Sequence, residues 1–362
     1  MKRALLRGLL VLAALAASTA GAEPRFALQT GFRCAQCHAN PSGGGLRNTF
    51  GNAWALTQLA ARSVEVPGAG LWTGIVGDRL AFGGNLRANA EWVDVPHQRR
   101  TSEFRTEEAR LYLDAAVIPG RLSFYVDERV APGSAENMEA NARLWLRQGT
   151  VYVKAGRMYL PFGWRLEDDN AFVRQLSGIN MQAPDSGVEA GYEHGPWSAQ
   201  FAVSNGTAGG PETDNGKQYT ARVEHVRARW RLGGSFSFND SAAGRRRVAG
   251  VFGGFDLGPT SWLGEFDHVD DDGLGPGGRK QLAGLAEVNW LIHQGHNLKA
   301  TWEWLDPDHD VAENEQTRAS LVYEWSPIQF LQLRVGFRRY DGIPQNDVQN
   351  RSQAFVQLHA FF

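Results

Sequence analysis

The stretch Glu108-Ala109-Arg110-Leu111-Tyr112-Leu113-Asp114-Ala115-Ala116-Val117 places an apolar residue at every second position and mostly polar residues between them. A period of two describes a β-strand with one apolar and one polar face. The same alternation recurs in 140–147, in 331–338 and in the closing residues 354–362. We count about sixteen such segments, of roughly nine to thirteen residues each, between residue 80 and the C-terminus.

The connections between these segments alternate between short and long. Short ones are expected near 118–120, 148–149, 194–196, 258–259, 293–296 and 326–327. Long ones are expected at 92–106, 131–138, 160–183, 205–216, 271–279, 306–315 and 341–350, with a shorter one near 240–245. An even number of strands with short turns at one end and long loops at the other is typical of an outer-membrane barrel. The sequence therefore predicts an all-β fold, an antiparallel barrel of about 16 strands.

The N-terminus reads as an export signal. Residues 1–22 carry Lys2 and Arg3, then an apolar run, and end in Ala20-Gly21-Ala22, which predicts cleavage before Glu23. No later segment reaches the roughly 18 consecutive apolar residues of a membrane helix. A net charge of −2 disfavours nucleic acid as a partner. We expect a signal peptide over 1–22, a small segment over 23–70 and the barrel over 71–362.

That small segment contains Cys34-Ala35-Gln36-Cys37-His38, a C-x-x-C-H motif with the only two cysteines of the chain. This spacing is the attachment signature of one covalent haem c, with His38 as the proximal iron ligand. The alternatives are a disulfide, half of a zinc site and a thioredoxin-type pair. A zinc site needs two further ligands, and none follows within about twenty residues. A thioredoxin pair belongs to a βαβ unit, and no such pattern surrounds the motif.

The residues that follow the motif predict a helix. Leu46, Phe50 and Trp54 recur four residues apart within Leu46–Arg62, so that this helix can cover a porphyrin or pack on neighbouring protein. The polar face of the barrel carries many arginines, which either line the pore or pair with haem propionates. They are Arg110, Arg129, Arg143, Arg147, Arg229, Arg231, Arg334 and Arg338.

The export signal, one C-x-x-C-H in a short leader and a barrel to the end of the chain resemble the fused monohaem cytochrome–porin proteins of the outer membrane. The outer-membrane iron-oxidising cytochromes are one branch of that family. The lead-in 26–34 and Phe50-Gly51 are similar to the family's, whereas residues 40–47 differ from the apolar stretch of the iron oxidisers. The resemblance implies a haem within a barrel. Because residues 40–47 differ, it supports iron oxidation less strongly.

A haem at the mouth or in the lumen of such a barrel predicts electron transfer across the outer membrane. The partners expected are a periplasmic c-type cytochrome or other redox carrier, an extracellular reductant or oxidant such as Fe(II), and outer-membrane lipid. The alternatives are a diffusion porin whose haem segment is a plug or redox sensor, and a small haem enzyme. Parity along the strands makes His359 and His293 the candidates for a second axial ligand.

Acidic clusters fall in the predicted long loops. These are Asp168-Asp169, Asp270-Asp271-Asp272 and the group 306–315 around His309. Carboxylates and imidazoles suit divalent iron or manganese. The simpler interpretation, which we favour, is that they are solvated loops. Because the apolar band of a barrel is about 25 Å tall, we expect the haem segment to enter the lumen so that small reductants can reach it.

Overall fold

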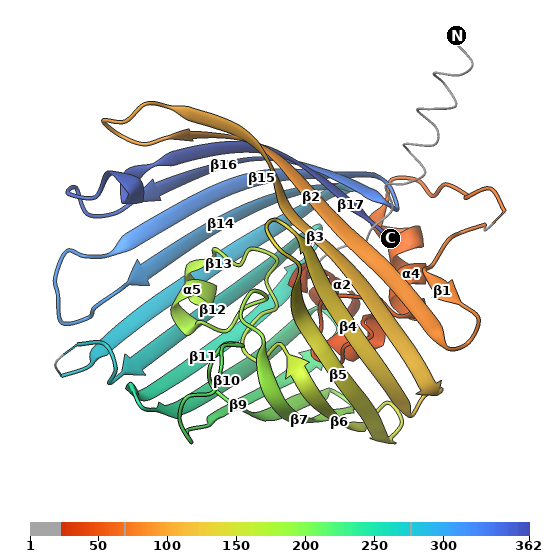
Figure 1. The fold of residues 1–362 in the computed structure, drawn as a ribbon. Helices are drawn as coiled ribbons and strands as arrows, with labels where there is room; N and C mark the ends of the chain where they lie inside the picture. Colours follow the sequence, from red (N-terminus) through yellow and green to blue (C-terminus); the bar gives the residue numbers. More distant parts are fainter. Residues whose placement is uncertain (1–22, 69, 276) are drawn as a thin grey trace, which may run out of the picture.

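The computed structural model describes residues 23–68, 70–275 and 277–362, and the expected signal peptide lies outside them. Sixteen long antiparallel strands form one closed barrel, in which the last strand pairs with the first from Ser352↔Asp94 to Phe361↔Asn85 (Figure 1). A two-residue strand, β1 (Ile75–Val76), pairs with the start of the first long strand. The all-β barrel expected from the alternation is confirmed, and so is its strand number.

The long strands follow one another around the barrel in chain order. They are β2 (Leu80–Asp94), β3 (Thr101–Ile118), β4 (Leu122–Ala131), β5 (Glu136–Arg147), β6 (Val151–Met158), β7 (Asp185–His194), β8 (Trp197–Ser204), β9 (Gln218–Arg227), β10 (Trp230–Ser241), β11 (Gly244–Leu257), β12 (Thr260–Asp271), β13 (Arg279–His293), β14 (His296–Asp306), β15 (Gln316–Ile328), β16 (Leu331–Asp341) and β17 (Ser352–Phe361). Each pairs with its neighbours, so the barrel has no free edge.

The two faces of the strands follow the sequence pattern. On β3, Leu111 is 55% exposed and Leu113 44%, whereas Arg110 is 2% and Tyr112 6% exposed. The apolar residues therefore point outward and the polar ones into the barrel, as an apolar solvent around the barrel requires. On β17, Val356 and Leu358 point outward while Gln357 and His359 are buried, which confirms the predicted register. No described helix is long and apolar enough to cross a membrane.

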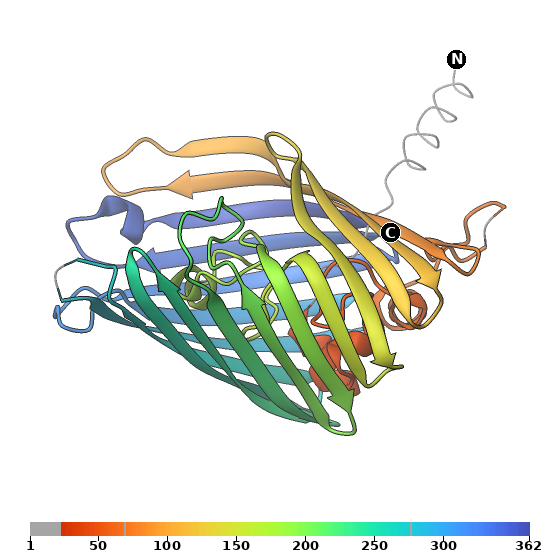
Figure 2. The same cartoon turned by 60° about the horizontal axis from the view of Figure 1, so that its bottom comes forward.

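The connections are sorted as expected, with two exceptions. At the long-loop end, β10 and β11 are joined by only two residues, 242–243. Residues 159–184, predicted to be an external loop, fold back into the barrel and carry the short helix α5 (Phe172–Ser177), as both views show (Figures 1 and 2). Their apolar side chains belong to a core inside the lumen: Leu160, Phe162 and Trp164 are at most 3% exposed. The prediction of an external loop was wrong because these side chains need apolar neighbours. We call residues 159–184 the inward loop.

The N-terminal segment also lies inside the barrel, at the end with the short turns. It contains α2 (Pro24–Thr30), α3 (Cys34–Cys37), α4 (Thr49–Trp54) and a π-helical turn, η1 (Ala55–Leu59). Its contacts reach well-separated strands: Asn40 donates to Glu139 on β5 at 2.9 Å, and Gln29 donates to Ser261 on β12 at 3.1 Å. The segment therefore occupies the bore. We call residues 23–62 the leader.

The helix predicted over Leu46–Arg62 is shorter than expected. Asn48 caps it by accepting from the Gly51 amide at 2.9 Å, so α4 begins at Thr49 and the helical turns end at Leu59. Leu46 lies before the helix and packs on Tyr112 and Tyr125 of the wall. Phe50 is 47% exposed. The three residues spaced four apart therefore do not share one surface, because Leu46 is not helical.

Candidate functional site

The C-x-x-C-H motif forms a single helical turn, α3. The Arg33 amide donates to Oε1 of Gln36 at 2.8 Å, and the His38 amide donates to the carbonyl of Cys34 at 2.9 Å. Residues three apart on a helix lie on the same side. Cys34 and Cys37 therefore present both thiols on one side of the turn, and neither is in a disulfide.

A tight loop returns the chain after His38. The Ala39 amide donates to the Leu46 carbonyl at 2.9 Å, and Gly45 has a φ of +62°. A Cβ on Gly45 would lie 2.1 Å from the Tyr125 hydroxyl, and one on Gly51 would lie 2.1 Å from the Cys37 carbonyl. Both positions therefore need glycine, which lets the loop approach the wall and lets α4 approach the motif.

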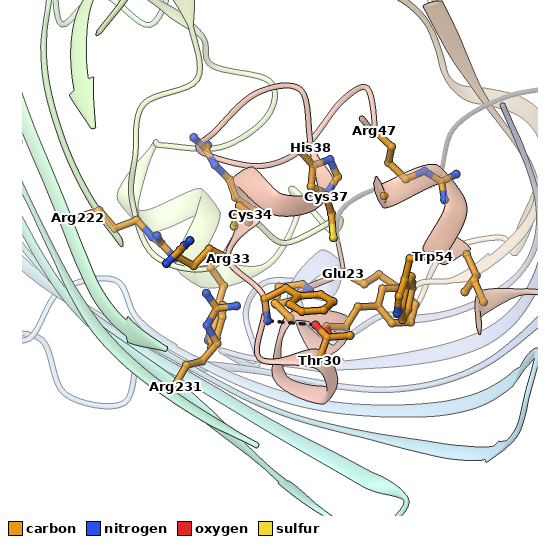
Figure 3. A pocket seen from close by; sticks show the side chains of 18 residues that line it. Glu23, Thr30, Arg33, Cys34, Cys37, His38, Arg47, Trp54, Arg222 and Arg231 are labelled. Carbon is orange, nitrogen blue, oxygen red and sulfur yellow. Dashed lines mark hydrogen bonds between the residues drawn. The ribbon is translucent and has the colours of Figure 1, made fainter. Parts of the chain in front are cut away.

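One cavity brings the motif together with the barrel. Cys34, Cys37 and His38 line it, with Arg222 and Arg231 to one side and Arg47 and Trp54 to the other (Figure 3). The rest of the lining is mostly apolar and aromatic, from Pro24, Phe26, Ala27, Phe32, Leu59 and Trp164.

Burial controls the protonation of the motif. It lowers the pKa of His38 to about 4, helped by the nearby charge of Arg47, so the imidazole is neutral at pH 7. Nδ1 of His38 is buried and makes no hydrogen bond. Burial raises the pKa of Cys37 to about 11, and also raises that of Cys34. Thiols this weakly acidic do not suit a thioredoxin-type pair, whose nucleophile is a thiolate.

Two buried arginines of the cavity have no carboxylate partner. Among the described residues, no acidic side chain lies within 4.0 Å of a guanidinium nitrogen of Arg47 or Arg165. Both side chains are at most 8% exposed, and burial lowers the pKa of Arg47 to about 10. An unpaired charge taken out of water is costly. The cavity thus offers cationic groups suited to an anionic ligand.

The other two arginines are only partly compensated. Arg222 on β9 and Arg231 on β10 share one carboxylate, Glu224, at 3.0 and 2.6 Å. Two thiols, a neutral imidazole, aromatic walls and surplus guanidiniums are the groups that a haem c requires, since its ring is apolar and its propionates are anionic. The residues present therefore fit this cofactor.

Only one of the arginines singled out from the sequence lines the cavity. That residue is Arg231, whereas Arg110 pairs with Asp127 at 3.2 Å and Arg334 with Glu167 at 3.1 Å elsewhere in the lumen. Arg143 pairs with Asp114, Arg129 with Glu136 and Arg338 with Asp168. Arg147, the last residue of β5, and Arg229, in the β9–β10 turn, are exposed. Arg47, Arg165 and Arg222 were not predicted, because only the folded chain shows that they meet the motif.

The two histidines proposed as second axial ligands do not line the cavity. His359 is 1% exposed, and its two ring nitrogens contact Asn85 at 2.9 Å and Gln332 at 3.2 Å. His293 lies exposed in the β13–β14 turn, where its ring is 3.9 Å from that of His296. A β-bulge between Leu291 and His293 ends the strict alternation there, so parity no longer gives the direction of His293.

Several of the acidic loop residues are paired with cations. Asp168 lies in the inward loop beside Arg318 at 2.9 Å, and not in an external loop as predicted. Asp271 pairs with Arg246 at 2.9 Å, and Asp308 with Arg279 at 3.2 Å. Within residues 23–68, 70–275 and 277–362, no group of three or more His, Cys, Asp or Glu side chains is arranged to hold a metal ion.

Comparison with known proteins concerns the barrel. No family model matches the chain, and no curated protein does. The solved structure of OmpT, an outer membrane protein of Vibrio cholerae, is similar with a TM-score of 0.63 and 14% identity, over 78% of this chain and 99% of that one. The anion-selective porin from Comamonas acidovorans is similar with a TM-score of 0.59 and 12% identity, over 78% and 99%. The structure of OprB from Pseudomonas putida is similar with a TM-score of 0.61 and 10% identity, over 79% of this chain and 94% of that one.

The fold is that of an outer-membrane porin. At these identities the likeness concerns the fold alone. Residues 80–361, from the first long strand to the last, make up about 78% of the chain, which is the share that the porin barrels match. The likeness therefore concerns the porin-type barrel, and the leader has to be interpreted from its own residues.

Proposed function

We propose that this chain is an outer-membrane electron-transfer protein that carries one covalent haem c inside a porin-type barrel. Cys34 and Cys37 would form the thioethers, and His38 would ligate the iron. The observation that carries the proposal is the cavity in which both thiols and the neutral imidazole meet the unpaired Arg47 and Arg165. When bound, the haem supplies one-electron redox chemistry.

The chain's own residues define what surrounds the cofactor. Arg47 and Arg165 would bind the carboxylates of the haem propionates, and Arg222 and Arg231 would add positive charge on the side of the barrel wall. The rings of Phe26 and Trp54 pack with centroids 4.9 Å apart and give the cavity an aromatic wall. A low-dielectric site with fixed positive charge favours the more reduced state of a bound redox group.

A series of cavities supports access from the long-loop end. A polar vestibule of about 1,640 Å³, lined by charged side chains, lies on the outer side of the inward loop. It shares Glu167 and Asp168 with a small middle cavity, which in turn shares Glu23 and Pro24 with the cofactor cavity. We infer that small extracellular donors or acceptors, Fe(II) among them, approach through the vestibule, while a periplasmic carrier is served from the short-turn end.

The decisive test is haem attachment. We expect the purified wild-type chain to retain haem stain after denaturing electrophoresis, and the Cys34→Ser/Cys37→Ser variant to lose it while still assembling a barrel. Ser42→Ala, in the loop that follows the motif, is a control. Retained stain in the double cysteine variant would refute the proposal. A redox titration of the loaded protein, with and without ferrous iron, then tests the donor.

A diffusion porin is the second candidate, favoured by the likeness to porin barrels. The two functions differ in conductance. If the leader fills the bore in the membrane, planar-bilayer conductance will lie far below that of an open porin of 16 strands. An open-pore conductance that is the same with and without haem would favour the porin function, with the leader as a plug or sensor.

A further inference from the structure

An open groove of about 710 Å³ lies on the short-turn face of the barrel, beside the cofactor cavity. Thr30, Phe32 and Arg33 line both the groove and the cavity. One layer of side chains therefore separates a cofactor in the cavity from the groove. Gln36, between the two cysteines of the motif, is exposed and lines the groove as well.

The groove is built rigidly from the leader and two neighbouring turns. Arg33 donates to the Gly195 carbonyl in the β7–β8 turn, and its Nε lies 3.2 Å from the Glu193 carboxylate. A Cβ on Gly31 would lie 2.9 Å from Cα of Ala228 in the β9–β10 turn. The leader is thus in direct contact with the barrel at the edge of the groove, which fixes the groove relative to the cavity.

The turns between the long strands at this face are basic. The connections 118–122, 147–151, 194–197, 227–230, 257–260, 293–296 and 326–331 contain four arginines and no carboxylate, although the chain as a whole has a net charge of −2. Two of the four, Arg227 and Arg229, flank Ala228 at the groove. All four are exposed, and none lies within 4.0 Å of an acidic side chain among the described residues; they are Arg121, Arg147, Arg227 and Arg229. We call these four residues the arginine rim.

We propose that the groove and the arginine rim are the docking surface for a small soluble electron carrier with an acidic face around its redox centre. This inference rests on the proposed function. Charge complementarity speeds the encounter of transient redox partners, which form small interfaces. One electron crosses the surface, so that one protein is oxidised and the other reduced, and no bond is made or broken.

The test uses the haem-loaded full chain in detergent and two reductants. Photoreduced flavodoxin is a small acidic protein, and the lumiflavin semiquinone is a small molecule that is neutral at pH 7. We expect the second-order rate with flavodoxin to fall about tenfold or more between 20 mM and 500 mM salt, because salt shortens the range of exposed charges. The lumiflavin rate should not change. Arg227→Glu/Arg229→Glu should lower the flavodoxin rate at low salt about tenfold and leave the lumiflavin rate unchanged.

The matched control is Arg99→Glu/Arg245→Glu, which changes the same number of exposed arginines at the long-loop end. An equal loss of flavodoxin rate in this control would overturn the inference, since net charge alone would explain it. A second result would also overturn the inference. If the rim variants keep the flavodoxin rate but are no longer more stable in phosphatidylglycerol vesicles than in phosphatidylcholine vesicles, the rim is assigned to lipid binding. A chain that neither reductant reduces would contradict the proposed function itself.

Discussion

Arg25 in the first helix of the leader donates to the carboxylate of Glu324 on β15, at 3.1 Å and across 299 residues of sequence. The Glu324 carboxylate also forms ion pairs with Lys299 of β14, at 2.9 Å, and with Arg334 of β16, at 3.4 Å. The leader is therefore connected to three adjacent strands through one buried acid.

Replacing that acid tests how the leader is held. In Glu324→Gln, three buried cations lose their shared charge, and breaking such a cluster costs on the order of 3–5 kcal/mol. We expect a lower midpoint of thermal unfolding and faster protease cleavage of the leader. Glu313→Gln, at an exposed loop position, is the control. Unchanged cleavage of the leader would mean that other contacts hold it.

The unpaired arginines predict effects of opposite sign in the loaded and unloaded chain. Arg47→Met in the Cys34→Ser/Cys37→Ser background should raise the free energy of unfolding by about 1–4 kcal/mol, because a buried charge is removed. In the loaded chain the same change should lower the midpoint potential, since a cation beside the cofactor favours the reduced state. Denaturant unfolding and redox titration measure the two effects. Arg143→Met, which removes a paired arginine, should destabilise both forms.

The histidines can be separated by absorption spectroscopy. His38→Ala should leave haem attached through the thioethers but change its spin state. His359→Ala should leave the spectrum unchanged. It should lower the stability by about 1–3 kcal/mol, because Asn85 and Gln332 lose a buried partner. A changed spin state in His359→Ala would instead support the ligand role inferred from the sequence.

A substitution by arginine tests which side chains face outward from the barrel. Leu144 on β5 is 42% exposed, and Leu144→Arg should cost about 2–4 kcal/mol if it faces the middle of a bilayer. Gln316→Arg, which lines the vestibule, should be mild. Urea unfolding in lipid vesicles measures both. Equal costs at the two sites would contradict the assignment of the faces.

Acid should release the inward loop. Burial acts to raise the pKa of Glu167, but the guanidiniums of Arg334 and Arg87 outweigh it, so that its pKa lies well below the usual 4.5. A lowered pKa gives stability that is present above pH 4.5 and is lost as the pH falls below it. We expect protease sensitivity of residues 159–184 to rise below about pH 4. In Glu167→Gln, the inward loop should be sensitive to protease at all pH values. A wild-type loop that stays protected at pH 2 would contradict this prediction.

The strands could be predicted from sequence because successive residues face the inside and the outside of the barrel in turn. Their polarity alternates accordingly, as in Arg110, Leu111 and Tyr112. The inward loop could have been recognised by its apolar content, since Leu160, Phe162 and Trp164 do not suit an external loop. The direction of His293 could not be predicted, because a bulge changes parity without a signature in the residues. Arg47 and Arg165 could not be assigned either, because their lack of partners is a property of the packed lumen.

Arg165 and Glu167 lie two residues apart in the inward loop, yet they line different cavities. Arg165 donates to the Ser42 carbonyl of the leader at 3.2 Å and faces the cofactor cavity, while Glu167 lines the vestibule. An ion that binds in the vestibule and moves the inward loop, or changes its charge, also acts on the cofactor cavity through this short connection. Thermodynamic linkage makes the coupling reciprocal. An ion that changes the midpoint potential must therefore bind with an affinity that depends, by the same coupling free energy, on the oxidation state.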